Sequence, residues 1–152
     1  MTDKLIAYFS YSGHTKAAAE DLARVTGADL FSIEAAEPYT DDDLDWHNDK
    51  CRSMQEAADR ASRPALAGVL PDLSAYKDVY IGFPIWYGIA PRVIDTFADA
   101  EESVLSGKRV ALFCTSGGSP ADHAGEKFSE AHPNVSVSCI KRISGPVSAD
   151  IL

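Results

Sequence analysis

The chain has 152 residues and a mass of 16.3 kDa, which is the size of one domain, so we expect residues 1–152 to form a single unit. Hydrophobic residues make up 45% and charged residues 24% of the sequence, and this ordinary globular usage excludes a disordered, collagenous or coiled-coil chain. The net charge of −9 and the pI near 4.7 have the wrong sign for neutralising phosphate backbones, so we expect no binding to nucleic acid or to an anionic membrane.

The first part of the chain predicts a strand, a loop, a helix and a second strand. A short apolar run predicts a buried, central strand over 5–9, and apolar residues at helical spacing predict a helix over 15–25 that ends before Gly27. Residues 30–33 predict the second strand. Residues 37–45 are acidic and contain a proline, which is typical of a solvated excursion.

A further helix is expected over 46–62, before Pro64. It would place Cys51, Met54 and Ala58 along one thin apolar face. The alternation of strands and helices then continues, with strands expected over 77–83, 108–114 and within 135–143, and helices expected after Pro91 and over 121–131.

This alternation predicts an α/β fold with a parallel sheet, right-handed crossovers and helices on both faces. In such folds ligands bind beyond the carboxyl ends of the strands, near the point where the strand order reverses. Three loops of unusual composition leave predicted strand ends here, and they are the candidates for a site.

The first of these loops reads Ser10-Tyr11-Ser12-Gly13-His14-Thr15 and joins a buried strand to a helix. The glycine allows the backbone to turn its N–H groups inward, and these amides, the hydroxyls and the positive end of the helix dipole together suit a phosphate group. The alternative is a plain Ser-rich N-cap. Other phosphate motifs are absent, because the sequence contains no Gly-x4-Gly-Lys-Ser/Thr and no Gly-x-Gly-x-x-Gly after the first strand.

The second loop, Pro84-Ile85-Trp86-Tyr87-Gly88, places two aromatic residues at the end of a strand. They either cover the edge of the core or lie against a planar ligand. The third, Thr115-Ser116-Gly117-Gly118-Ser119, is small and allows backbone amides to approach polar ring atoms, although as an isolated Gly-Gly turn it means little. Together the three loops fit a ligand with a phosphate tail and a flat polar ring, which describes FMN.

These segments resemble the matching segments of flavodoxins and flavodoxin-like proteins, and the resemblance spans most of the chain. Glu37-Pro38-Tyr39 and residues 56–64 resemble a subgroup of short bacterial flavodoxin-like proteins. The resemblance implies a five-stranded, doubly wound parallel sheet in the order 2-1-3-4-5.

The resemblance also implies an FMN site in three parts. The phosphate would be held by Ser10, Ser12, Gly13, His14 and Thr15. The isoalloxazine would be flanked by Pro84, Ile85, Trp86, Tyr87 and Gly88, with Trp86 or Tyr87 against or beside the ring. Its pyrimidine end would be lined by Thr115, Ser116, Gly117 and Gly118.

Two features depart from the family pattern. Many flavodoxins carry an aspartate and a stacking tyrosine in the loop after the fourth strand, whereas Gly117, Gly118 and Ser119 stand here, so we expect one face of the flavin to be open. Only six residues follow Pro146, and this implies a truncated closing helix. Apolar surface left uncovered by a short helix would favour a homodimer.

We therefore expect an electron carrier that shuttles electrons between protein redox partners, in which the flavin supplies the chemistry. The acidic surface would suit a partner with a basic docking surface. The alternatives are an FMN-dependent NAD(P)H oxidoreductase acting on quinones or similar acceptors, and a flavin-binding regulator without turnover.

The sequence also bears on the location of the protein. The longest apolar runs, 79–83 and 110–114, are far shorter than the roughly 20 residues that cross a bilayer, and the first residues lack the features of a signal peptide. The three cysteines are odd in number and widely spaced, which indicates reduced thiols rather than a disulfide framework or a metal site. We expect a soluble, cytoplasmic protein.

Overall fold

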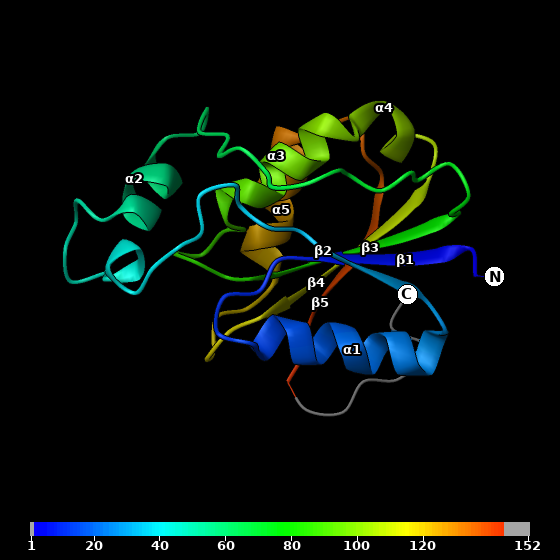
Figure 1. The fold of residues 1–152 in the computed structure, drawn as a ribbon, viewed down its shortest axis with the longest axis horizontal. Helices are drawn as coiled ribbons and strands as arrows, with labels where there is room; N and C mark the ends of the chain where they lie inside the picture. The colour runs from blue at the N-terminus through cyan, green and yellow to red at the C-terminus, as the bar shows by residue number, and fades with distance from the viewer. Residues whose placement is uncertain (1, 145–152) are drawn as a thin grey trace.

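A sheet of five parallel strands forms the centre of the computed structural model, which describes residues 2–144 (Figure 1). The strands are β1 (Lys4–Tyr8), β2 (Asp29–Ser32), β3 (Asp78–Pro84), β4 (Arg109–Thr115) and β5 (Val137–Arg142). Their order is β2-β1-β3-β4-β5 and each neighbouring pair is parallel. The predicted α/β fold and strand order are confirmed, and β1 is an interior strand between β2 and β3, next to the central strand β3.

Helices cover both faces of this sheet. They are α1 (His14–Thr26), α2 (Arg52–Ala58), α3 (Arg92–Ala100), α4 (Glu102–Leu105) and α5 (Asp122–Ala131), with a short 3-10 helix η1 (Asp42–Leu44). Figure 1 shows α1 on one face of the sheet and α3 and α5 on the other. Because β1, β3 and β4 are buried on both faces, they are almost continuously apolar, as parallel strands of α/β proteins are.

Two apolar cores result, one on each side of the sheet. The smaller core joins α1 to β1, β3 and β4, and contains Ile6, Leu22, Tyr80 and Phe113. The larger core packs α3 and α5 against the opposite face and contains residues such as Phe83 and Phe97. The edge strands β2 and β5 are partly exposed.

Glycines in the left-handed region bound α1 at both ends. Gly13 has φ of 97° at the N-cap, and Gly27 has φ of 74° at the C-cap and donates its N–H to the carbonyl of Ala23 at 2.8 Å. The predicted loop, helix and glycine stop are therefore confirmed, and the loop delivers the first turn of α1 to the carboxyl edge of the sheet.

The helix predicted over 46–62 is wrong in extent, because α2 spans only Arg52–Ala58. Before it, Asp45 and Asn48 accept hydrogen bonds from backbone N–H groups two residues ahead at 3.2 and 3.0 Å, and such local bonds compete with a helix. The buried helical residue is Ser53, whereas Ala58 of the predicted apolar face is exposed.

Two short elements of the structure lie outside the sequence prediction. The elements η1 and α4 were not predicted, because each is only a turn or so long. The predicted truncation of a closing helix falls in residues 145–152, outside the described residues. Within residues 2–144 the structure contains no helix that is both long and apolar enough to cross a membrane.

Candidate functional site

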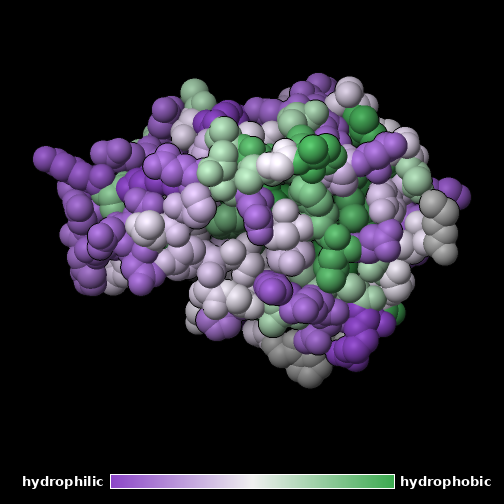
Figure 2. Space-filling view, viewed as in Figure 1, coloured by the Kyte–Doolittle hydropathy of each residue, from purple (hydrophilic) through white to green (hydrophobic). Residues whose placement is uncertain are grey.

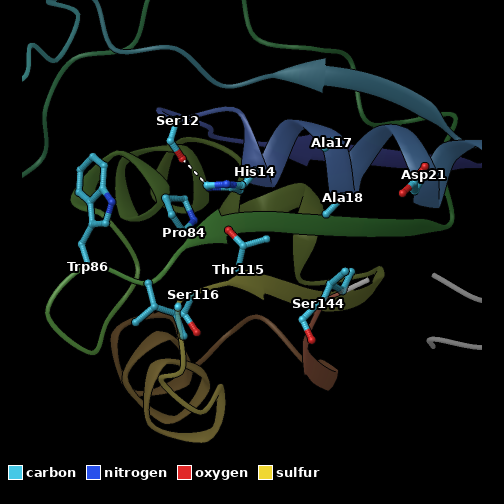
Figure 3. A pocket seen from close by; sticks show the side chains of 13 residues that line it. Ser12, His14, Ala17, Ala18, Asp21, Pro84, Trp86, Thr115, Ser116 and Ser144 are labelled. Atoms are coloured by element: carbon cyan, nitrogen blue, oxygen red, sulfur yellow. Dashed lines mark hydrogen bonds between the residues drawn. The ribbon is translucent and has the colours of Figure 1, made fainter. Parts of the chain in front are cut away.

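The three predicted loops meet at the carboxyl edge of the sheet, where they border a cavity of about 570 Å³ (Figure 3). Its lining comes from loop 10–15 and α1, from the segment after β3, and from the segments after β4 and β5. The lining residues are Ser12, His14, Ala17, Ala18, Asp21, Pro84, Ile85, Trp86, Thr115, Ser116, Gly117, Ile143 and Ser144. In Figure 3, Trp86 lies at one end of the cavity and Asp21 and Ser144 lie at the other, with Thr115 between them.

Eight of the fourteen predicted site residues line this cavity, and they come from all three loops: Ser12, His14, Pro84, Ile85, Trp86, Thr115, Ser116 and Gly117. The other six, Ser10, Gly13, Thr15, Tyr87, Gly88 and Gly118, belong to the same loops but lie outside the lining. The structure therefore brings the loops together, while the binding role of each residue stays a prediction.

Sequence reasoning missed five lining residues: Ala17, Ala18, Asp21, Ile143 and Ser144. The helical residues lie on the side of α1 that faces the cavity (Figure 3). The spacing from His14 to Ala17, Ala18 and Asp21 was a usable signal, because residues three and four apart share one helix face.

The first loop is held by its own hydroxyl groups. The Gly13 N–H donates to Ser10 Oγ at 3.2 Å, and Ser12 Oγ lies 3.0 Å from His14 Nδ1. No side chain caps the N-terminus of α1, whose N-cap residue is Gly13. The first-turn amides of α1 are therefore available to a ligand, which is the property that makes helix N-termini bind anions.

Thr15 connects the first loop to the end of β4. It is only 1% exposed, and its Oγ1 lies 2.7 Å from Oγ1 of Thr115, which lines the cavity. In such a pair one hydroxyl donates and the accepting hydroxyl keeps its own proton. The phosphate side and the ring side of the predicted site are thus joined by a buried hydrogen bond.

The aromatic loop is a tight turn. Backbone hydrogen bonds join Trp86 and Ile89 in both directions, at 2.9 and 3.1 Å. The two residues between them, Tyr87 and Gly88, have φ of 55° and 82°, and this pair of positive angles is typical of a type I′ turn. We call residues 86–89 the aromatic turn.

The two aromatic side chains of this turn have different surroundings. Trp86 packs edge-on against Phe9 and Tyr39, with ring centroids 5.5 and 5.2 Å away, and also lines the cavity. Tyr87 is 44% exposed, and its hydroxyl lies 2.7 Å from Ser53 Oγ of α2. Partial burial raises the pKa of Tyr87 above its ordinary value, so the phenol stays protonated at neutral pH.

The loop after β4 has an open backbone. A Cβ added to Gly117 or Gly118 would meet no atom within 4 Å. Ser116 is held by Arg142 of β5, whose Nε donates to Ser116 Oγ at 2.9 Å and whose Nη2 donates to the Ser116 carbonyl at 3.1 Å. A ligand could therefore approach the peptide groups of this loop without displacing side chains.

The titratable groups around the cavity are few. His14 and Asp21 line it, and no cluster of three metal-ligating side chains occurs anywhere in residues 2–144. Beside these two groups the lining offers hydroxyls and the Trp86 ring.

Comparison with known proteins identifies the family. Residues 3–152 match the flavodoxin family. The chain belongs to the flavodoxin family. Its fold also matches a protein provisionally designated a flavoprotein from Bacteroides eggerthii DSM 20697, with a TM-score of 0.91 and 37% identity over 96% of this chain and 91% of that one.

Two further solved structures place this flavodoxin-family protein among its relatives. A provisionally designated flavoprotein from Bacteroides uniformis ATCC 8492 matches with a TM-score of 0.90 and 37% identity, over 96% of this chain and 92% of that one. A flavoprotein from Lactobacillus acidophilus NCFM, solved in complex with FMN, has a TM-score of 0.79 and 24% identity, with 93% of each chain covered. No curated protein matches the sequence.

Proposed function

We propose that this member of the flavodoxin family binds FMN at the carboxyl edge of its sheet and carries electrons between protein redox partners. The observation that carries the proposal is the cavity itself, because it joins an uncapped helix N-terminus to an aromatic turn and to an open-backbone loop. Family membership and the FMN complex of the Lactobacillus acidophilus flavoprotein support the choice of ligand.

The phosphate end of FMN fits the first loop. The free amides of the first turn of α1 and the hydroxyls of Ser12 and Thr15 would donate to the phosphate oxygens, and the helix dipole would favour its charge. Ser10 at present accepts the Gly13 N–H, so a phosphate would compete with Ser10 for that donor.

The ring end fits the aromatic turn and the loop after β4. Trp86 is covered by Phe9 and Tyr39 and also lines the cavity, which suits contact with a flat ring. The open backbone at Gly117 would allow peptide groups to meet the polar edge of the isoalloxazine. The bound FMN would supply one- and two-electron redox chemistry, which the protein side chains do not.

The charge distribution favours a carrier with a basic partner. Residues 34–50 hold seven acidic side chains and one lysine. Figure 2 shows hydrophilic residues gathered over the part of the molecule where η1 and α2 lie in Figure 1, and the hydroxyl of Ser53 in α2 contacts Tyr87 of the aromatic turn. A negatively charged protein surface would disfavour additional negative charge on the flavin, which lowers its potential and suits an electron donor.

One observation favours a second candidate, an FMN-dependent NAD(P)H oxidoreductase acting on quinones or similar acceptors. The loop after β4 carries no aromatic side chain over the site, and its exposed glycines leave space beside the ring for a second substrate. Such an enzyme would show steady turnover with NAD(P)H, whereas a carrier would not.

Titration of FMN into the purified apoprotein, followed by visible absorption, tests the ligand. We expect saturable binding and a perturbed flavin spectrum. Photoreduction of the complex and assay with NADH and NADPH then separate the two functions. Accumulation of one-electron-reduced flavin without NAD(P)H turnover supports the carrier, whereas steady turnover supports the oxidoreductase. An unchanged free-flavin spectrum would contradict both.

A further inference from the structure

We propose that α2 is the positioning element of the aromatic turn, with Ser53 and Glu56 as its positioning residues. Ser53 holds Tyr87 directly, and Glu56 holds Trp86 through Tyr39. This inference rests on the proposed placement of the flavin ring against Trp86, and it assigns a function to a segment that the sequence marks only as a thinly apolar helix.

Ser53 contacts Tyr87, a residue with a strained backbone conformation. Tyr87 has φ of 55°, in a region that bulky residues rarely adopt, and such outliers persist only when the surroundings hold them. The Tyr87 hydroxyl is 2.7 Å from Ser53 Oγ, and Ser53 is only 3% exposed although it is polar. The buried Cys51, whose Sγ lies 3.4 Å from Ser53 Oγ, extends this contact to a chain of three polar groups that ends at the exposed Tyr87 of the aromatic turn.

The contact of Glu56 acts on the other aromatic residue. Tyr39 donates its hydroxyl to Glu56 Oε1 at 2.5 Å, and Arg52 donates from Nε to Glu56 Oε2 at 2.8 Å. The Arg52 guanidinium also lies over the Tyr39 ring, 3.9 Å from its centroid. Glu56 therefore fixes the hydroxyl of Tyr39, and Arg52 packs on the face of its ring. The Tyr39 ring in turn packs against Trp86 in a T-shaped arrangement, with the ring centroids 5.2 Å apart.

Burial and the Glu56 bond both raise the pKa of Tyr39 above its ordinary range, so the phenol remains a donor to Glu56 at neutral and mildly alkaline pH. Ser53 and Glu56 are three residues apart, and this spacing places them on one face of a helix. One short helix therefore contacts Tyr87 of the aromatic turn directly and reaches Trp86 through Tyr39.

A positioning element must itself be held, and α2 is held by Arg92 of α3. Arg92 donates from Nε to the Glu56 carbonyl at 3.0 Å and from Nη2 to the Ala57 carbonyl at 2.8 Å. Its Nη1 lies 3.1 Å from Oδ2 of the buried Asp95. Arg92 thereby fixes α2 relative to α3, and α2 in turn fixes the aromatic turn. A helix of only seven residues needs such an anchor, because isolated helices of that length are not stable in water.

The test uses the full chain with Trp46→Phe, so that Trp86 is the only tryptophan; Trp46 is 64% exposed and lies outside the site. In this background we compare Glu56→Ala, Glu56→Gln and Ser53→Ala with Gln55→Ala, an exposed neighbour on the same helix that serves as the matched control. Each variant is measured at a temperature well below its own melting temperature. The readouts are acrylamide quenching of Trp86 in the apoprotein and dissociation constants for FMN and riboflavin.

We expect Glu56→Ala to increase the quenching of apoprotein Trp86, and Glu56→Ala and Ser53→Ala each to weaken FMN about two- to tenfold, the range that one net hydrogen bond gives. Riboflavin should weaken by the same factor, because the change is at the ring and not at the phosphate. Glu56→Gln, which keeps an acceptor oxygen, should restore most of the affinity. In a double-mutant cycle, Tyr87→Phe should add little to Ser53→Ala.

The inference is overturned if Glu56→Ala and Ser53→Ala lower only the melting temperature and match Gln55→Ala in quenching and in both affinities. Failure of the proposed flavin placement has a different signature. In that case Trp86→Ala leaves the FMN affinity unchanged, while Glu56→Ala still alters the quenching of Trp86 in the apoprotein.

Discussion

Trp86 and Tyr87 are neighbours in the chain, yet the positive φ of Tyr87 directs their side chains to different partners. We predict that Trp86→Ala weakens FMN and brightens the bound flavin, because an indole in contact with the ring quenches its fluorescence by electron transfer. The lost stacking is worth about 0.5–1.5 kcal/mol beyond the buried area. Tyr87→Ala should show the same effect if Tyr87 is the stacking residue. Fluorescence titration of both variants checks this. Unchanged FMN affinity and unchanged flavin fluorescence in both variants would show that the aromatic turn is not part of the flavin site.

The hydroxyl groups of the first loop are expected to bind the phosphate of FMN and not its ring. Ser12→Ala combined with Thr15→Ala should weaken FMN far more than riboflavin, since each lost bond to a charged group costs about 1.5–3 kcal/mol. Thr15 also bonds Thr115, so Ser12→Ala alone serves as the comparison in which that buried contact is kept. Isothermal titration of both ligands into all three proteins measures the difference. Equal losses for riboflavin and FMN would contradict a phosphate role for this loop.

At the scale of elements, the packing of the Phe113 ring of β4 against β3 depends on Gly82. A Cβ at this position would overlap the ring of Phe113, its neighbour on β4, and both residues are buried. We predict that Gly82→Ala destabilises the fold by about 1–3 kcal/mol, because the crowded ring must move within a packed core. Gly117→Ala is the matched control, since its added methyl group meets no atom and should leave stability nearly unchanged. Urea denaturation of both variants tests the prediction, and equal midpoints would refute it.

At the scale of the whole molecule, buried acidic groups set an alkaline limit to stability. Burial raises the pKa of the Cys114 thiol to about 11 from an ordinary value of 9.0. Below pH 9 the thiol is protonated in both the folded and the unfolded state, so the free energy of unfolding does not change with pH through this group. As the pH rises from 9 towards 11 the unfolded state ionises first, so the free energy of unfolding falls by up to about 1.4 kcal/mol per pH unit.

We therefore predict that the unfolding free energy of the native protein declines more steeply between pH 9 and 11 than that of a Cys114→Ala variant. Urea denaturation at a series of pH values measures both slopes. Taking the difference between the two proteins isolates Cys114 from Cys51 and Tyr39, whose pKa values are shifted as well. Parallel slopes would show that this thiol does not contribute.

The sequence by itself determined the sheet order through its resemblance to flavodoxins, and it determined the places of the three loops, because alternating apolar runs and glycine stops are local signals. Only the tertiary structure decided the surroundings of the site. Asp45 and Asn48 shortened the predicted helix by local hydrogen bonds, and Ser53 and Glu56 acquired their partners Tyr87 and Tyr39 across gaps of 34 and 17 residues. Such contacts join side chains that are distant in sequence. Hydrophobic periodicity and turn chemistry act between near neighbours, so they do not predict these contacts.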